Sequence, residues 1–454
     1  MKVLFAAHQF FPEHSAGVEV VTLSLAQELK LRGHEPYVLA AKRSIPGNDI
    51  RPGEVEDYEH EGIPVRRVGR PEEGFARPYR LDYENPTMAE RTREYLLETE
   101  PDVVHAQHFQ GLSAEVIPVF KEHGLPVVYT VTDFWTFCPV VDLRRHDGAL
   151  CEGPELAHCV RCIASRYPGS RVKQISDLAP NSAIRAAGLV SRTPASRFSH
   201  QLRQVRAVGD RPGAIRERVN LVDRFVAYTH LTRDLLLLNG IGEGRIEVSH
   251  YGINTSGIRK APEGDEDPSR PLRAGYMGTL APHKGCDTLV EAFRLLPGEL
   301  DASLTVYGDP NRFPEYCESL YARAAGDERI SFAGPFRRER MGEVLAGMDV
   351  LVVPSRWYEN APGVIFESFA AGVPVVATDL GGLSEFVEHR ENGLLFALED
   401  EEDLAQQLRL LHEEPGLLHR LREGIGPVKT VGENVDELER LYASLVEEAD
   451  RGER

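Results

Sequence analysis

The chain has 454 residues, 42% of them hydrophobic, so it is long enough for two domains that each bury a core. Its formal net charge of −19 argues against nucleic acid as a partner, because a polyphosphate would be repelled. No apolar run approaches the roughly 18 residues of a membrane span, and the N-terminal apolar stretch, which ends at Ala7, has the length of a buried strand and not of a signal peptide. We therefore expect a cytoplasmic protein.

The first half of the chain predicts alternating strands and helices. Apolar side chains recur with helical spacing at Val18, Val21, Leu25 and Leu29, which predicts a helix from Ala16 to Arg32. The alternation predicts a parallel sheet with helices on both faces, in a first domain over residues 1–258 with a cysteine-containing insertion at about 134–220. We expect the other strands at Lys2–His8, Glu35–Ala41, Asp102–Gln107, Val127–Thr132 and Arg224–Thr229, and further helices at Met88–Glu98 and Ser113–His123.

A second alternating set follows the proline-rich, acidic linker Ala261–Pro271. The acidic triplet 265–267 in this linker is similar to a metal-binding motif, but no buried strand is predicted beside it. The α/β pattern predicts two doubly wound domains, the second over residues 270–428, with a ligand in the crevice at the C-terminal ends of their strands. A final helix within residues 429–454 is expected to cross back to the first domain. The predicted strands are Arg273–Met277, Ser303–Tyr307, Ile330–Phe332, Val350–Val353 and Val373–Ala377.

Residues 350–393 predict a strand, a polar loop and a helix that begins after a proline. Gly363 and Val364 lie at the N-terminus of this helix, where free N–H groups and a partial positive charge suit a phosphate. Glu367 in the second turn suits the paired hydroxyls of a ribose, and Glu359 in the loop suits a sugar hydroxyl. A diphosphate flanked by two sugars fits this pattern. The alternative is an ordinary strand–loop–helix with two solvated glutamates.

This stretch resembles the donor-binding motif of the retaining glycosyltransferase family 4, which has the two-domain GT-B fold. The resemblance covers nearly the whole chain, because FFPEHSAGVEVVTLSLAQELKLRGHEPYVLA is similar to the family's opening loop and first helix, and YMGTLAPHKGCDTLVEAF to the start of its second domain. It implies an enzyme that moves a hexose-type sugar from a nucleotide-diphosphate-sugar to a glycan, lipid-linked or small-molecule acceptor. It also implies that the departing phosphate takes the acceptor proton, with no cofactor for catalysis.

The resemblance assigns roles to three residues in the glycine-containing loops. Lys284 would lie near the diphosphate and stabilise the charge on the leaving phosphate. Gly17 would allow the donor to approach the N-terminus of the first helix closely. Thr279 stands where the family usually has an arginine, and its hydroxyl can donate a hydrogen bond without supplying a charge. For Lys284 and Gly17 the alternatives are a surface lysine and a simple loop glycine.

Two further catalytic candidates lie at the ends of strands in the first domain. Asp133 ends the strand VVYTVTD, and Thr132 before it stands where the family usually has a histidine that contacts the donor sugar. His105, in DVVHAQH, lies at the end of another strand. The residues leave open whether His105 faces the crevice or is a core histidine with satisfied hydrogen bonds.

Four of the six cysteines, Cys138, Cys151, Cys159 and Cys162, are clustered in the sequence. Cys159 and Cys162 have the spacing of a zinc knuckle, and the other two could complete a tetrahedral thiolate site. We predict a structural zinc ion that orders the insertion and takes no part in catalysis. Free thiols, disulfides and an iron–sulfur cluster are the alternatives.

The leading hypothesis is a retaining glycosyltransferase, and the alternative is a non-catalytic GT-B protein that binds nucleotide-sugars. A dehydrogenase with tandem dinucleotide-binding domains is disfavoured, because no strand is followed by Gly-x-Gly-x-x-Gly. The arginine-rich stretch 185–218 is either a solvated helical face or a patch for peripheral contact with the inner membrane face.

Overall fold

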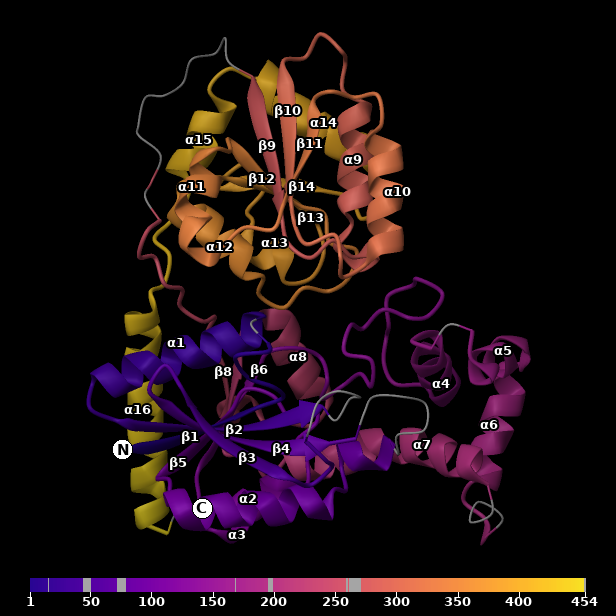
Figure 1. The fold of residues 1–454 in the computed structure, drawn as a ribbon, viewed down its shortest axis with the longest axis vertical. Coiled ribbons are helices and arrows are strands. Elements are labelled where there is room, and N and C mark those ends of the chain that lie inside the picture. The colour runs from indigo at the N-terminus through magenta and orange to yellow at the C-terminus, as the bar shows by residue number, and fades with distance from the viewer. Residues whose placement is uncertain are drawn as a thin grey trace. The chain divides into compact units, whose positions relative to one another are not determined.

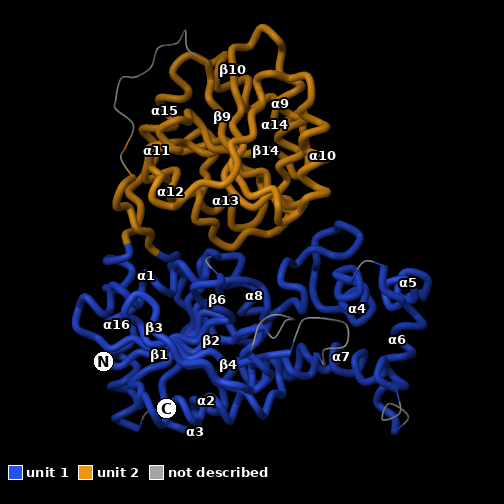
Figure 2. Tube along the Cα trace, in the orientation of Figure 1, with its two compact units in different colours: residues 1–251, 431–454 blue, residues 252–430 orange. Residues whose placement is uncertain are grey.

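In the computed structural model the chain forms two compact units, residues 1–251 with 431–454 and residues 252–430 (Figure 2). The structure describes residues 1–14, 16–43, 50–71, 79–167, 169–194, 199–258, 260 and 271–452. Residues 261–270 of the predicted linker, including the acidic triplet, lie outside the described residues. No helix in the described ranges is long and apolar enough to cross a membrane.

The first unit, hereafter unit 1, is built on an eight-stranded sheet in the order β3-β4-β2-β1-β5-β6-β7-β8. Neighbouring strands pair in parallel, except for the antiparallel hairpin of β3 and β4. The strands are β1 (Lys2–Ala7), β2 (Glu35–Arg43), β3 (Val55–His60), β4 (Ile63–Arg70), β5 (Val103–Ala106), β6 (Val127–Val131), β7 (Arg224–Ala227) and β8 (Ile246–Val248).

The helices of unit 1 fall into a group around the sheet and an extension at one end of α7 (Figure 1). The group around the sheet comprises α1 (Gly17–Leu31), α2 (Pro86–Thr99), α3 (Val116–Glu122), α8 (His230–Leu238), α16 (Val431–Asp450) and the short 3-10 helices η1 (Tyr79–Asp82) and η3 (Glu243–Arg245). The extension comprises α4 (Leu156–Ser165), α5 (Arg171–Leu178) and α6 (Asn181–Val190), which adjoin α7 (His200–Val219).

The C-terminal helix α16 lies against α1 and belongs to unit 1. Its apolar side chains, among them Val435, Leu438 and Leu445, are buried with Val3 and Phe5 of β1 in one core cluster. The chain therefore leaves unit 1 after residue 251 and returns at residue 431.

The second unit, unit 2, has a six-stranded parallel sheet in the order β11-β10-β9-β12-β13-β14. Its strands are β9 (Leu272–Met277), β10 (Ala302–Tyr307), β11 (Ile330–Gly334), β12 (Val350–Val353), β13 (Val375–Thr378) and β14 (Gly393–Phe396). Its helices are η4 (Pro282–Lys284), α9 (Cys286–Arg294), α10 (Pro314–Ala324), η5 (Arg338–Arg340), α11 (Met341–Ala346), α12 (Gly363–Ala370), α13 (Leu383–Phe386), α14 (Glu401–Glu413) and α15 (Leu417–Glu423).

Strand β12 shows why helices cover both faces of the sheet in unit 2. Successive side chains of a strand point to opposite faces. Val350 and Val352 accordingly belong to the core cluster of α9, α10 and α14, whereas Leu351 and Val353 belong to the cluster of α11, α12 and α13. All four side chains are buried, as is typical of a parallel sheet covered on both sides. The predicted α/β fold of two doubly wound domains is thereby confirmed.

The domain boundaries differ from those predicted. Residues 252–258 belong to unit 2 and not to the first domain, because the Ile253 N–H donates to the Lys429 carbonyl at 3.0 Å and Ile253 bridges to Thr430. The chain thus crosses between the units at two adjacent places, near residues 251 and 430.

Candidate functional site

Helix α12 of unit 2 forms where the proline and glycine pattern predicts it. Pro362 is its N-cap and no side chain caps the helix, so the first N–H groups, at Gly363 and Val364, lack the intrahelical partners that later residues have. Ile365 and Phe369 anchor the opposite face of the helix in the core. The partly exposed helix N-terminus therefore presents the positive end of its dipole, which is suited to an anion.

Lys284 and Glu359 meet beside this helix. The Lys284 ammonium donates to Oε1 of Glu359 at 2.6 Å, and the same oxygen accepts from Ser355 Oγ at 2.6 Å and Trp357 Nε1 at 2.8 Å. Lys284 also lies 5.0 Å from the centre of the Trp357 ring. Burial alone would raise the pKa of the Glu359 carboxyl, but the ammonium and the three hydrogen bonds outweigh it and lower that pKa. The pair is therefore ionised, and Oε2 of Glu359 accepts none of these bonds.

The loops that carry this pair are locked together. The Arg356 N–H donates to the His283 carbonyl at 2.9 Å, and its guanidinium bonds Asp287 at 2.9 Å and Thr288 at 2.7 Å at the start of α9. A Cβ on Gly285 would lie 1.9 Å from the Pro354 carbonyl oxygen, and Gly285 has φ of 68°. Only glycine allows this approach, which sets Lys284 against the loop before α12.

Glu367 lies in the second turn of α12, as predicted, and is 95% buried. Its Oε1 accepts from the half-exposed Arg338 guanidinium at 2.5 Å. Arg338 belongs to η5 and was not identified from the sequence, because nothing in the RRER run around it distinguishes this arginine from its neighbours. A buried carboxylate held by one cation in the second turn of the helix is preorganised to accept further hydroxyl donors.

Thr279 lies in the loop after β9 and is partly exposed. Its carbonyl accepts from the Tyr276 hydroxyl at 2.9 Å and from the Ala281 N–H at 3.0 Å. These bonds hold the backbone of the loop, while the side-chain hydroxyl is left for the hydrogen bond that the sequence predicts.

In unit 1, Asp133 pairs with a histidine that was not predicted. Its Oδ1 accepts from the Trp135 N–H at 2.8 Å, and its Oδ2 is hydrogen-bonded to Nε2 of His108. The Gln110 N–H donates to Nδ1 of His108 at 2.9 Å, so Nδ1 is an acceptor and Nε2 carries the proton that binds Asp133. Thr132 donates its hydroxyl to the Gln107 carbonyl at 2.8 Å, which occupies its side chain.

A second histidine extends this group. The His8 ring lies 4.6 Å from the ring of His108, and its Nε2 lies 3.5 Å from Oε1 of the fully buried Glu19 in the first turn of α1. Burial, with the charge of Arg70 nearby, holds the pKa of His8 well below its usual value, so this ring is neutral at pH 7. Gly17, two residues before Glu19, is exposed, and a Cβ there would meet no heavy atom within 4 Å.

The structure does not support a catalytic role for His105. The ring is fully buried and packs against Phe5 and Tyr442. One ring nitrogen bonds the Tyr442 hydroxyl and the other lies 2.7 Å from the Thr130 hydroxyl. DVVHAQH thus contains one core histidine, His105, and one at the strand end, His108; β5 ends at Ala106, so only the second emerges from the sheet.

His105 should make the fold sensitive to acid. Burial lowers its pKa to about 3, so the unfolded chain binds a proton below about pH 6.5 that the folded chain does not. Stability should therefore fall as the pH drops from about 6.5 to about 3, with a slope near 1.4 kcal/mol per pH unit from this residue. In His105→Gln, urea unfolding should show a shallower pH dependence in this window. Equal slopes in the variant and the wild type would mean that His105 does not cause this acid sensitivity.

The four clustered cysteines line one cavity of about 260 Å³ together with His158. Burial, and then the neighbouring thiols, raise the pKa of Cys159 to about 12. Within the described ranges no group of three or more His, Cys, Asp or Glu side chains is arranged to hold a metal ion, so the structure gives no tetrahedral arrangement of these thiols. Cys151 instead donates to the Gly153 carbonyl at 3.3 Å.

Structural zinc therefore remains a prediction, and it has a direct test. If zinc is bound by these thiolates, protein purified without added metal should contain about one zinc per chain. Cys159→Ser should then release the metal and leave nucleotide binding unchanged, because unit 2 contributes none of the four thiols. Less than about 0.1 metal per chain, with all four thiols titrating, would mean that no such site exists.

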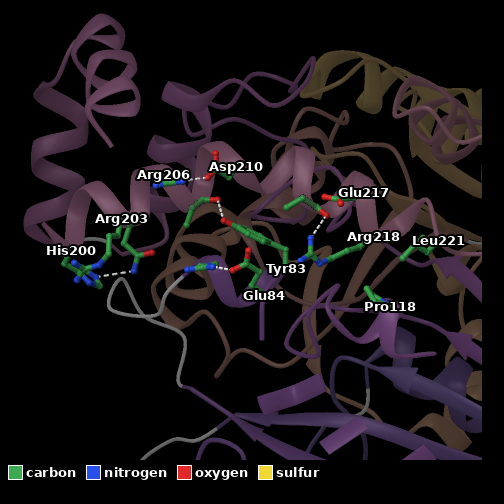
Figure 3. Close-up of a pocket in the computed structure, with 14 residues that line it drawn as sticks. Tyr83, Glu84, Pro118, His200, Arg203, Arg206, Asp210, Glu217, Arg218 and Leu221 are labelled. Atoms are coloured by element: carbon green, nitrogen blue, oxygen red, sulfur yellow. Dashed lines mark hydrogen bonds and ion pairs between the residues drawn. The ribbon is translucent and has the colours of Figure 1, made fainter. Parts of the chain in front are cut away.

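A larger cavity, of about 790 Å³, lies along α7 in unit 1 and is lined by none of the predicted site residues (Figure 3). Its charged side chains are largely paired with one another, as in the Arg206–Asp210 ion pair at 3.3 Å and the pair of Arg80 with Glu84. The cavity thus lacks the convergent groups that the loops of unit 2 bring together.

Two family models match the chain, one for each part of the fold. The family described as "Glycosyltransferase Family 4" matches residues 15–150, and "Glycosyl transferases group 1" matches residues 271–414. Together they cover more than half of the chain and contain Gly17, Asp133, Lys284 and Glu367. The chain belongs to glycosyltransferase family 4.

Curated relatives of this family 4 chain include D-inositol 3-phosphate glycosyltransferases. The protein from Nocardia farcinica is 31% identical over 255 residues, covering 51% of this chain and 56% of its own length. The protein from Mycobacteroides abscessus is 29% identical over 222 residues, covering 45% and 49%. The chain thus spans about half the length of the curated relatives it matches.

Solved structures extend the fold likeness to the whole chain. Alr3699/HepE of Anabaena, in complex with UDP, has a TM-score of 0.63 at 16% identity, covering 98% of this chain and all of its own. Sucrose-phosphate synthase from Thermosynechococcus elongatus has a TM-score of 0.62 at 16% identity, covering 98% of each chain. At this identity the likeness shows the fold, and it confirms the predicted GT-B architecture.

Proposed function

We propose that the chain is a retaining glycosyltransferase that moves a sugar from a nucleotide-diphosphate-sugar to an acceptor hydroxyl. The observation that carries the proposal is the set of groups gathered in unit 2. An uncapped helix N-terminus at Gly363, the Lys284–Glu359 ion pair and the buried carboxylate of Glu367 belong to one helix and the loops beside it. These groups match a phosphate, a leaving-group charge and a ribose respectively.

In the proposed reaction, the bond between the anomeric carbon and the phosphate oxygen breaks, and the acceptor oxygen bonds the same face of that carbon. The acceptor proton passes to the departing phosphate oxygen, so no protein base is needed. Lys284 stabilises the growing negative charge, with the helix N-terminus as a second positive group. Glu359 holds Lys284 in place through Oε1 and has Oε2 for a sugar hydroxyl.

The donor and acceptor are proposed from the relatives. HepE was solved with UDP and with UDP-glucose, which supports a uridine nucleotide as the first donor to test. The curated relatives are named for D-inositol 3-phosphate, which supports a polyol or sugar hydroxyl as acceptor. In the Asp133–His108 pair of unit 1 the histidine is buried and Asp133 is partly exposed, so its carboxylate can accept from such a hydroxyl.

The alternative is a GT-B protein that binds nucleotide-sugars without turnover. It is favoured by Thr132, whose hydroxyl is engaged by the backbone, and by Thr279, which supplies no charge. Incubating the full chain with UDP-sugars, with and without polyol acceptors, separates the two. Release of UDP supports the enzyme, whereas saturable binding with no release over many hours supports the binding protein.

Turnover should need no divalent metal. The helix N-terminus and Lys284 supply the positive charge that Mg²⁺ or Mn²⁺ supplies to a diphosphate elsewhere. UDP release should therefore be unchanged by excess EDTA, with the zinc content measured in the same sample. Activity that disappears with EDTA and returns with Mn²⁺, while any zinc stays bound, would contradict this mechanism.

A further inference from the structure

The insertion over residues 134–220 of unit 1 is basic, in contrast to the rest of the chain. It contains fourteen Lys or Arg residues and seven Asp or Glu residues, a net charge of +7, whereas the whole chain carries −19. At physiological salt the field of each surface charge is screened beyond about 8 Å. The electrostatic potential at the surface of the insertion therefore depends on the insertion's own residues and not on distant acidic ones. The insertion therefore attracts anionic surfaces.

Helices α5 and α6 of this insertion expose large apolar side chains. Leu178, the last residue of α5, is 86% exposed, and Leu189 and Val190 at the end of α6 are 73% and 46% exposed. Ile175, one turn before Leu178, is 65% exposed. These four residues are a third of the large hydrophobic side chains found exposed in the described ranges.

The packing of α6 explains why these side chains face outward. Ile184 is buried, and Gly188 on the same face lies so close to α4 that a Cβ there would be 2.5 Å from Leu156. The opposite face consists of Ser182, Ala183 and Ala186 with Leu189 and Val190, all exposed. Arg185 is the one charged residue in this helix. An exposed apolar helix face of this kind usually marks a surface that binds a protein or a membrane.

We propose that the outer faces of α5 and α6 dock onto a lipid bilayer that carries anionic headgroups. Leucine side chains that enter the interface, flanked by Arg and Lys, are the chemistry that binds such a surface peripherally. Arg171 is exposed at the start of α5, where it can reach headgroup phosphates. Arg192, just after α6, is 66% exposed and pairs with Asp210 at 3.3 Å, a surface ion pair that a phosphate can replace. This proposal does not depend on the transfer reaction.

A second copy of the chain is the competing occupant, and charge disfavours it. A symmetric dimer through this face would bring two basic insertions together, and like charges in contact oppose association. The outer faces of two helices of eight and ten residues are also small beside the area of about 800 Å² per partner that a stable interface buries.

The test is cosedimentation of the full chain with vesicles of phosphatidylcholine alone or with about 30 mol% phosphatidylserine. We expect at least about tenfold stronger association with the anionic vesicles, since each basic residue near the surface contributes about fivefold. Raising NaCl from about 0.1 to about 1 M should abolish most of the difference. Equal sedimentation with both kinds of vesicle, or no sedimentation with either kind, would overturn the proposal.

Variants locate the surface. Leu178→Ser with Leu189→Ser should weaken association about tenfold or more, because two apolar side chains no longer enter the interface. The matched control is the double variant Leu31→Ser with Leu97→Ser. Leu31 on α1 and Leu97 on α2 are 83% and 70% exposed and lie outside the insertion, so this variant should bind the vesicles as the wild type does. Equal loss in both pairs would contradict the assignment. If the wild type formed a concentration-dependent dimer without lipid, and only Leu178→Ser with Leu189→Ser abolished it, the face would bind a second copy of the chain and not a membrane.

Discussion

Replacing Lys284 with alanine is expected to lower kcat by about 100- to 1,000-fold, while donor affinity changes by less than tenfold. The ammonium lies beside the predicted diphosphate position, and its charge matters most when the phosphate leaves. Loss of one preorganised group of this kind costs about 2.7–4 kcal/mol in the transition state. Initial rates of UDP release at saturating donor, with calorimetric titration of UDP, measure the two effects separately.

Stability must be controlled in this experiment, because Lys284 is the counterion of a buried carboxylate. Removing one partner of such a pair costs about 3–5 kcal/mol of unfolding free energy. The double variant Lys284→Ala with Glu359→Gln removes both charges and should regain much of the stability without regaining turnover. Lys284→Arg should retain part of the rate. If the folded single variant turned over within about threefold of wild type, Lys284 would have no role in charge stabilisation.

Replacing Glu367 with alanine is expected to weaken nucleotide binding about ten- to a hundredfold. A carboxylate that accepts two ribose hydroxyls makes charge-assisted hydrogen bonds, worth about 1.5–3 kcal/mol together. Among the residues that the structure describes, only Arg338 donates to the Glu367 side chain, and it does so through Oε1, so Oε2 is available to the ribose. Titration calorimetry with the nucleoside diphosphate measures the change.

Two controls separate ribose binding from the Arg338 pair. Arg338→Ala removes the half-exposed partner and leaves the carboxylate, so binding should change by no more than about fivefold. Glu343→Ala, on the exposed face of α11, should leave affinity unchanged. A 2′,3′-dideoxy nucleotide should bind wild type and Glu367→Ala equally. An unchanged dissociation constant in Glu367→Ala would mean that this carboxylate does not bind the ribose.

The nucleotide-binding half of the fold follows closely from local sequence signals. The run of four buried apolar residues in β12, the proline before Gly363 and the turn after α12 each act over a few residues. Pattern and turn chemistry therefore place α12, and with it Glu367. The meeting of Lys284 with Glu359 depends on Gly285 packing against the Pro354 carbonyl, a contact between loops 69 residues apart that no local pattern encodes.

Unit 1 shows the opposite situation. The hairpin β3–β4 was not predicted, because VEDYEH is a charged, partly exposed edge strand and β4 buries Arg66 and Arg67 where apolar residues are expected. Arg66 is paired with Asp57 in β3, and Arg67 is paired with Glu13 in the turn after β1, so neither partner lies in β4 itself. Of the two histidines in DVVHAQH, only His105 was considered from the sequence, because the pattern does not show that the strand ends at Ala106.

The charge on the insertion could be counted from the sequence, but its apolar surface could not. Ile184 and Leu189 are both large apolar residues of α6, but they lie on different faces of the helix, and the sequence does not show which face is buried. Only the packing of Gly188 against Leu156 determines that one is buried and the other exposed. Tertiary contact thus decides which apolar residues are core and which are surface.

The most direct test of the central claim is calorimetric titration of the full chain with UDP, GDP, ADP and TDP, in wild type and in Glu367→Ala. The account predicts that at least one of these nucleotides binds wild type saturably without added metal, and that Glu367→Ala weakens that nucleotide by about tenfold or more. Folded wild-type protein that binds none of the four, or a bound nucleotide whose affinity is the same in the variant, would contradict it.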